Sequence, residues 1–384
     1  MATASDVGVS TTVVTPSSAP PRSGALDGLR GVAVLSVMAY HLVWAAPEIA
    51  APPFAQGGWV GVDVFFVLSG FLIGGLLLAE MDRTATIDLR AFFGRRFLRL
   101  YPAMVAFLVA VTTFTVIVDH VPLRRLAPSL QAAFLYYLNV PLSHNHYLFP
   151  TIVHLWTLSV EFHFYLLLPP LLLILRATRA PRWAWAATLT ILGTAVAVNR
   201  SRAWNDHSSF LGPYVSTFTR LDALLAGVLL ALFRHQGWLR AARSAGSRRW
   251  PISPAAVLAA AGAGWLGFVV WTTPTDQAWL YHWGMVVDTA AATAVVWFLV
   301  AAPGAGVARF LASPLPRWLG ERSYALYLCH YAVFVAVQQH LPDLGPWPRV
   351  FVGPAIALAI AEVSYRLVES PALRLKSRLS RAGP

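Results

Sequence analysis

The chain has 384 residues, of which 57% are hydrophobic and only 12% are charged. Soluble domains carry about 25% charged residues, so this composition excludes an ordinary soluble protein and indicates an integral protein of the lipid bilayer. The net charge of +12 does not indicate a nucleic-acid partner, because the basic residues lie at the ends of apolar segments and not in one patch.

The N-terminal residues, 1–25, are rich in Ser, Thr, Pro and Ala and lack the basic and apolar regions of a signal peptide. This composition predicts a disordered cytoplasmic tail. We expect a transmembrane domain over residues 26–373 and a basic cytoplasmic tail over residues 374–384.

Apolar segments long enough to cross a bilayer, which takes roughly 20 residues, follow the tail. They begin near Leu29, Trp59, Leu100, Ile152, Trp183, Tyr214, Ile252, Trp279, Ser323 and Val350. A further segment, residues 126–142, is short and bounded by prolines. If it does not span, most arginines lie on the side of both termini, which the positive-inside rule places in the cytoplasm. We therefore predict an all-α membrane helix bundle of about ten transmembrane helices in a bacterial plasma membrane, with cytoplasmic termini and residues 126–142 only partly embedded.

The first apolar segment contains Arg30 and, eleven residues later, His41. Eleven helical steps return to nearly the same face, about 16 Å further along the axis. Polar groups at membrane depth are costly and are therefore functional candidates. A snorkelling arginine and a structural, hydrogen-bonded histidine would explain the same pattern.

Glu161 lies roughly 14 Å from the outer end of the segment that begins near Ile152. This depth predicts that it lies level with His41, although the two helices run in opposite directions. A histidine beside a carboxylate is typical of a general base with its orienting group, or of two proton-handling groups, and a buried structural pair is the alternative. His154, nearer to the start of the same segment, fits a structural role.

The second and third segments contain further polar residues. Asp63 lies near the outer end of the second segment, and Ser69 and Gly70 lie in its middle, where small residues indicate either close helix packing or a broken helix that lines a cavity. In the third segment, Arg96 and Arg99 share one helical face. They suit either an interfacial anchor or a phosphate site, since guanidinium groups bind phosphate in a bidentate fork.

The later segments contain three weaker candidate sites. Asp222 lies two residues after Arg220, and this proximity predicts a structural ion pair. Tyr327 and His330 lie in the middle of one span and form either packing contacts or a cavity wall. Asp288 has no obvious partner in its own span.

Six motifs in order resemble the acyltransferase-3 family of membrane O-acyltransferases. They are LDGLRGVAVLSVMAYH, GVDVFFVLSGFLIG, RRFLRLYP, HLWTLSVEFHFYLLLP, RLDALLAG and SYALYLCH. The resemblance covers nearly the whole predicted domain and implies an acyl-CoA donor, usually acetyl-CoA, that binds from the cytoplasm. It also implies a hydroxyl acceptor on a sugar, such as a cell-surface polysaccharide, peptidoglycan or a macrolide-like glycosylated natural product. We expect no metal cofactor.

By position, the resemblance implies that His41 is the catalytic base and that Glu161 is the family's membrane carboxylate. It implies that Arg30, Arg96 and Arg99 bind the phosphates of the donor. Weaker candidates for the cavity wall are Asp63, Ser69, Asp222, Tyr327 and His330. Acceptor contacts are expected from the outer loops, which contain His144, His146, Asn205, Asp206 and His207.

Some family members contain a soluble hydrolase-type domain after the membrane domain. Since this chain stops at Pro384, we expect a stand-alone membrane domain, so that any second transfer step would need another protein. A proton-coupled transporter or permease is the main alternative, because a histidine and a glutamate at mid-membrane also suit a proton relay. A structural membrane scaffold is the third interpretation.

Overall fold

The computed structural model describes residues 23–49, 55–146, 148–206, 209–239 and 253–379. Every regular element in these ranges is helical, which confirms the all-α fold class. Of the two predicted tails, residues 1–22 and 380–384 lie outside the described residues. The first helix already begins at Gly24, two residues before the predicted start of the transmembrane domain.

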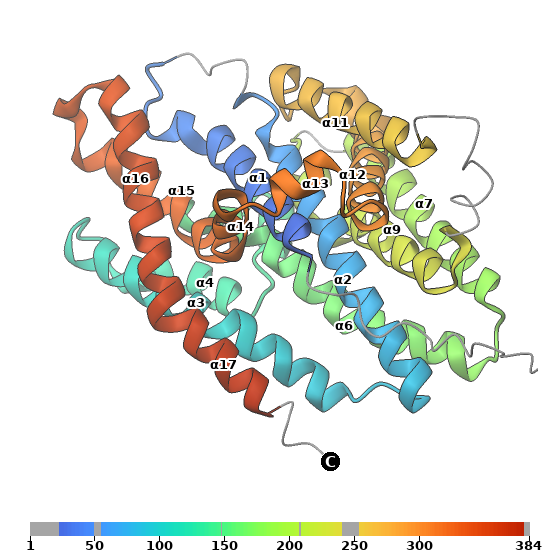
Figure 1. Ribbon diagram of the computed structural model, residues 1–384. Coiled ribbons are helices and arrows are strands. Elements are labelled where there is room, and N and C mark those ends of the chain that lie inside the picture. The colour runs from blue at the N-terminus through green and yellow to red at the C-terminus, as the bar shows by residue number, and fades with distance from the viewer. Residues whose placement is uncertain (1–22, 50–54, 147, 207–208, 240–252, 380–384) are drawn as a thin grey trace, which may run out of the picture.

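Long helices occupy the predicted segments in chain order (Figure 1). They are α1 (Gly24–His41), α2 (Gly61–Thr84), α3 (Leu89–Ile117), α6 (Trp156–Ala177), α7 (Arg182–Asp206), α9 (Thr217–His235), α11 (Pro254–Thr272), α12 (Met285–Ala301), α15 (Ser323–His340) and α16 (Pro346–Ser364). Short elements connect or extend them: η1 (Leu42–Trp44), η3 (Gly58–Val60), α4 (Leu123–Phe134), α5 (Asn139–Ser143), η4 (Pro150–Leu155), α8 (Leu211–Val215), η5 (Leu280–Gly284), α13 (Gly306–Leu311), α14 (Pro314–Glu321), η6 (Pro342–Leu344), η7 (Tyr365–Glu369) and α17 (Ser370–Leu379).

Several of these helices are long and apolar enough to cross a membrane, which confirms a multi-pass membrane helix bundle. Within the described ranges there are 7 such stretches: Gly58–Thr84, Leu89–Ile117, Pro150–Ala177, Leu211–His235, Pro254–Thr272, Leu280–Ala301 and Pro346–Leu375. Helices α1, α7 and α15 occupy the other predicted segments, but polar residues such as Arg30, Arg200 and His330 make them less apolar. The count of ten transmembrane helices and the cytoplasmic termini stay predictions.

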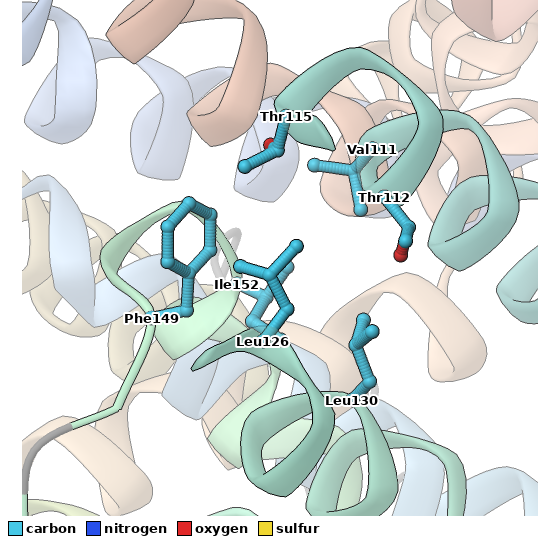
Figure 2. A pocket seen from close by; sticks show the side chains of 7 residues that line it. All are labelled: Val111, Thr112, Thr115, Leu126, Leu130, Phe149 and Ile152. Carbon is cyan, nitrogen blue, oxygen red and sulfur yellow. The ribbon is translucent and has the colours of Figure 1, made fainter. Parts of the chain in front are cut away.

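Residues 126–142 form most of α4, then a turn, then α5. Helix α4 has 12 residues, which is too short to cross a bilayer core of about 30 Å. Where α4 packs against α3 and η4, the helices leave a pocket of only about 10 Å³ (Figure 2). Such a volume holds at most one water molecule, so this pocket offers no room for a substrate. The pocket is lined by Val111, Thr112, Thr115, Leu126, Leu130, Phe149 and Ile152.

The first half of α1 packs closely against α13 and α14 (Figure 1). A Cβ atom added at Gly28 would lie 1.9 Å from the backbone oxygen of Leu311, and one at Gly320 would lie 1.7 Å from the backbone oxygen of Asp27. Only glycine permits such an approach between backbones. This packing fixes the part of α1 that carries Arg30.

Helices α2 and α9 also pack backbone against backbone. A Cβ atom at Gly70 would lie 1.9 Å from the oxygen of Leu224, and one at Gly227 would lie 2.2 Å from the oxygen of Val67. Helix α2 is continuous over Gly61–Thr84. Close packing is therefore the correct interpretation of its small residues, and the alternative of a broken helix is wrong.

Candidate active site

An arginine cluster, formed by Arg30 of α1 with Arg96 and Arg99 of α3, lies where these two helices approach α6. Arg99 interacts electrostatically with both Arg30 and Arg96. Among the described residues, none of the three forms a hydrogen bond or a salt bridge, and Arg30 Nε is buried without a partner. Arg96 instead faces the rings of Phe92 and Tyr165, at 5.9 Å and 5.4 Å from their centroids. Three gathered positive charges that form no salt bridge among the described residues are unfavourable by themselves, so this arrangement suits an anionic ligand.

Glu161 of α6 lies beside the arginine cluster. Its Oε1 atom accepts hydrogen bonds from the hydroxyl groups of Ser69 and Tyr165. The carboxylate also interacts electrostatically with Arg30 and Arg96. Side chains from α1, α2, α3 and α6 therefore converge on one carboxylate.

The predicted pairing of Glu161 with His41 differs from the arrangement in the structure. Within the described part of the chain, the hydrogen bonds of Glu161 go to Ser69 and Tyr165, whereas His41 contacts His330. The physical reason lies in the helix ends. His41 is the last residue of α1 and lies in one group with His330 and His154 of η4. Glu161 comes seven residues after His154, about two turns farther along the chain. Glu161 thus lies on the arginine side.

A histidine cluster, formed by His41, His330 and His154, lies at the other end of α1. His41 Nδ1 is 3.0 Å from His330 Nε2. His330 is fully buried, and its Nδ1 lies 3.0 Å and 2.9 Å from the backbone oxygens of Leu326 and Tyr327. The ring of His154 lies 5.3 Å from that of His330. The structure therefore brings together His41 and His330, which sequence analysis had treated separately.

His154 is the member of this cluster whose position was underestimated from the sequence. It is buried in η4, and its Nε2 donates to the backbone oxygen of Leu328 at 3.2 Å. The signal that could have placed it is its spacing from Glu161, because residues seven apart lie on the same side of a helix, two turns away.

One face of α6 connects the two clusters. Thr157, Glu161 and Tyr165 are spaced four residues apart and therefore share a face. Thr157 Oγ1 is 2.7 Å from the hydroxyl of Tyr327, which donates to the backbone oxygen of His154 at 2.6 Å. Tyr327 also interacts electrostatically with Glu161. A polar wall about 16 Å long thus runs beside α1, from its arginine end to its histidine end.

Asp63 and Asp222, two weaker candidates, belong to buried ion pairs. Arg220 Nη2 is 2.6 Å from Asp63 Oδ1, and Arg200 Nη1 is 2.7 Å from Asp222 Oδ2. The predicted pairing of Asp222 with Arg220 is therefore wrong, because residues two apart on a helix point in different directions. Arg200 is buried in α7. These pairs join α2, α7 and α9.

Asp288 also has a partner that its own span could not reveal. The indole Nε1 of Trp265 on α11 donates to Asp288 Oδ1 at 2.7 Å. Among the described residues, no group of three or more His, Cys, Asp or Glu side chains is placed to hold a metal ion.

The segment between α11 and η5 lies beside the end of α1 that carries His41. Tyr40, next to His41, has its hydroxyl 3.5 Å from Thr275 Oγ1, and Tyr281 donates to the backbone oxygen of Thr275 at 2.6 Å. Of the residues expected in the acceptor loops, His207 lies outside the described residues. His144, His146 and Asn205 are exposed, and Asp206 ends α7.

Comparisons with known proteins identify the family of this membrane bundle. A family model described as an acyltransferase domain matches residues 23–365. The protein named "Putative O-acetyltransferase SACOL0978" of Staphylococcus aureus (strain COL) is 31% identical over 371 residues, which cover 90% of this chain and 56% of that protein. "O-acetyltransferase OatA" of Staphylococcus aureus (strain NCTC 8325 / PS 47) is 30% identical over 358 residues, with the same coverage of 90% and 56%. The chain thus spans about half the length of the relatives that it matches. No solved structure matches it.

Proposed function

We propose that this chain, which belongs to the acyltransferase-3 family of membrane O-acyltransferases, transfers an acetyl group from acetyl-CoA to a hydroxyl group of a carbohydrate or glycosylated acceptor. The observation that supports the proposal most directly is the polar wall. It joins three arginines, none of which forms a salt bridge among the described residues, to a histidine that is placed to act as a base. The relatives named O-acetyltransferase support the same class of reaction.

The arginine cluster is the proposed binding site for the donor. Coenzyme A carries phosphate groups at one end and the thioester at the other. Arg30, Arg96 and Arg99 present several N–H donors in fork geometry, which suits phosphate better than lysine does. With the phosphates held there, the pantetheine arm would extend along the Thr157–Tyr165 face of α6 and bring the thioester toward His41.

His41 is the proposed general base. It takes the proton of the acceptor hydroxyl as the oxygen attacks the carbonyl carbon of the thioester. The carbon–sulfur bond then breaks, and the departing thiolate of CoA recovers the proton from the imidazolium. A positioned base of this kind typically contributes about 10²–10⁴ in rate.

The proposed role of Glu161 is at the donor site and not as the orienting partner of His41. Its carboxylate balances the positive charge of Arg30 and Arg96 and orients the hydroxyl groups of Ser69 and Tyr165. We propose that it shapes the donor end of the polar wall. We also propose that residues 26–373 form the transmembrane domain and that the donor end of the polar wall faces the cytoplasm.

The test uses the purified full chain in detergent with acetyl-CoA. Wild-type protein should bind CoA. It should also cleave acetyl-CoA slowly and release the free thiol of CoA, with water as the substitute acceptor. His41→Ala should bind CoA but release at least about 100-fold less thiol. A matched control is His163→Ala. His163 is a histidine of α6 that contacts Thr217 (2.7 Å from Nδ1 to Oγ1) and belongs to neither cluster. Undiminished release by a folded His41→Ala variant would overturn the assignment.

The same experiment separates the enzyme from the transporter. A proton-coupled permease would neither bind nor cleave acetyl-CoA. The acceptor is identified by mass spectrometry of the cell envelope and of small metabolites from cells with and without the protein. The acceptor is the molecule that carries an O-acetyl group in cells with the wild-type protein and lacks it in cells with the His41→Ala variant.

A further inference from the structure

The hydrogen bonds of His330 determine which ring nitrogen of His41 carries a proton. His330 Nδ1 lies 3.0 Å from the backbone oxygen of Leu326 and 2.9 Å from that of Tyr327. A carbonyl oxygen can only accept a hydrogen bond, so the proton of the His330 ring lies on Nδ1. Nε2 of the neutral ring then carries a lone pair.

A doubly protonated His330 would leave this conclusion open, but its surroundings disfavour that form. The side chain is 0% exposed, and a buried charge without a partner is costly. Among the described residues, its hydrogen bonds go to the two carbonyls and to His41, and no carboxylate takes part. The neutral ring with its proton on Nδ1 is therefore the form that the contacts support.

The tautomer of His41 follows from that of His330. His41 Nδ1 lies 3.0 Å from His330 Nε2, and only one of these two nitrogens can carry the shared proton. Since His330 Nε2 holds a lone pair, His41 Nδ1 must be the donor. The lone pair of neutral His41 is then on Nε2, which can accept a proton.

We infer that His330 is a positioning residue, which holds His41 in the tautomer with Nε2 as the base and accepts the Nδ1–H bond of the imidazolium that forms during transfer. This inference rests on the proposed function of His41. In serine hydrolases a carboxylate performs the corresponding task for the catalytic histidine. A neutral imidazole instead avoids a second buried charge, and its hydrogen bond strengthens when His41 becomes charged.

The titratable groups around His41 are compatible with this role. They are His330 and His154 from α15 and η4, Tyr331 with its ring 5.0 Å away, and Tyr40, also at 5.0 Å. Each is neutral in its ordinary form at this depth, so none supplies a negative charge. The backbone oxygen of Val37, one turn earlier in α1, also accepts from the His41 ring, so the variants below test what the acceptor atom of His330 adds to it.

Three substitutions of His330 separate the hydrogen bond from the space that the ring fills. In His330→Gln, the amide oxygen reaches toward the position of Nε2 and can accept from His41. In His330→Asn, the shorter amide keeps the contacts with the carbonyls but does not reach His41. In His330→Leu, both contacts are absent. Gln should therefore keep the wild-type tautomer of His41, whereas Asn and Leu should not.

The readout is steady-state thiol release from acetyl-CoA as a function of pH, together with the melting temperature in detergent. We expect His330→Asn and His330→Leu to lower kcat at least about 100-fold, with the KM for acetyl-CoA unchanged. The acid limb of kcat/KM should move to lower pH, because the imidazolium of His41 loses the acceptor atom of His330. His330→Gln should stay within about 10-fold of wild type, with its acid limb unmoved. The control His163→Leu should leave both values unchanged.

Equal activity and equal acid limbs for the folded Gln and Asn variants would overturn the inference. If His330→Leu does not fold, the comparison of Gln with Asn still decides, since both are polar and close in size. Failure of the proposed function is a different result, namely a fully active His41→Ala. Loss of activity in His41→Ala together with full activity in His330→Asn would contradict only the role of His330.

Discussion

Replacing Arg99 by glutamine should weaken donor binding without destabilising the protein, and these two effects together test the arginine cluster. Arg99 has no hydrogen bond or salt bridge among the described residues. It interacts electrostatically with Arg30 and Arg96, which carry the same charge, and with the carboxyl group of Glu369. Its removal relieves repulsion from two arginines and loses one attraction, so the stability of the free protein should change little. In the complex it removes hydrogen bonds to a charged phosphate, which are worth about 1.5–3 kcal/mol and correspond to about 10- to 150-fold in Kd.

The matched control for this experiment is Arg95→Gln. Arg95 lies on the same helix, but it is bound to Glu80 at 3.3 Å and is 37% exposed. Its loss should change the Kd of CoA less than about 3-fold, and stability by no more than about 1 kcal/mol. Isothermal titration with CoA and thermal melting in detergent measure both quantities. The reasoning is refuted if Arg99→Gln binds CoA as wild type does, or if it melts as a strongly destabilised protein without CoA.

Other predictions concern packing, ion pairs and pH. Gly28→Ala should destabilise the protein by about 1–3 kcal/mol through overpacking against Leu311. Gly94→Ala, with no atom near its added Cβ, should stabilise α3 by about 0.5–1 kcal/mol. Equal shifts in the melting temperatures of the two variants would contradict this. Asp63→Asn should cost about 3–5 kcal/mol, because it leaves Arg220 buried without its charge partner, and chemical denaturation should show much of that loss restored in Asp63→Asn combined with Arg220→Met. In the loop after η1, the hydrogen bond from Arg349 holds the pKa of Glu48 below its usual value. That contribution to stability is complete above the usual pKa and lost as the pH falls through the lowered one, so the difference in melting temperature between wild type and Glu48→Gln should shrink in acid.

Hydropathy and spacing were sufficient to predict what depends on one segment at a time. The order of the long helices, the continuous α-helical class and the neighbouring positions of Arg96 and Arg99 all follow from a chain that buries apolar residues with a period of 3.6. The short α4–α5 segment was separated from the spans by the distribution of arginines, which is also a property of linear sequence.

Contacts between helices were not predictable in the same way. His41 and His330 are 289 residues apart, and no periodicity in α1 or α15 encodes their meeting. The depth of Glu161 did not reveal its neighbour, because His41 at the end of α1 lies level with His154 and not with Glu161, seven residues farther on. The incorrect pairing of Asp222 with Arg220 was avoidable, since residues two apart do not face each other on a helix.

The close packing of α1 has a consequence for the range of donors. Arg30 and His41 belong to one 18-residue helix, and its first half is held against α13 and α14 by glycines that allow no sliding. Under the proposed function, this helix fixes the distance between the site that binds the phosphates of CoA and the site where the thioester reacts. Longer acyl chains extend beyond the carbonyl carbon and leave the distance between the phosphates and the thioester unchanged. Donors that lack the nucleotide, such as short synthetic thioesters, lack the phosphates that would hold the donor at the arginine cluster. Selectivity for the carrier would then be set by α1, and selectivity for the acyl chain by the aromatic surroundings of His41.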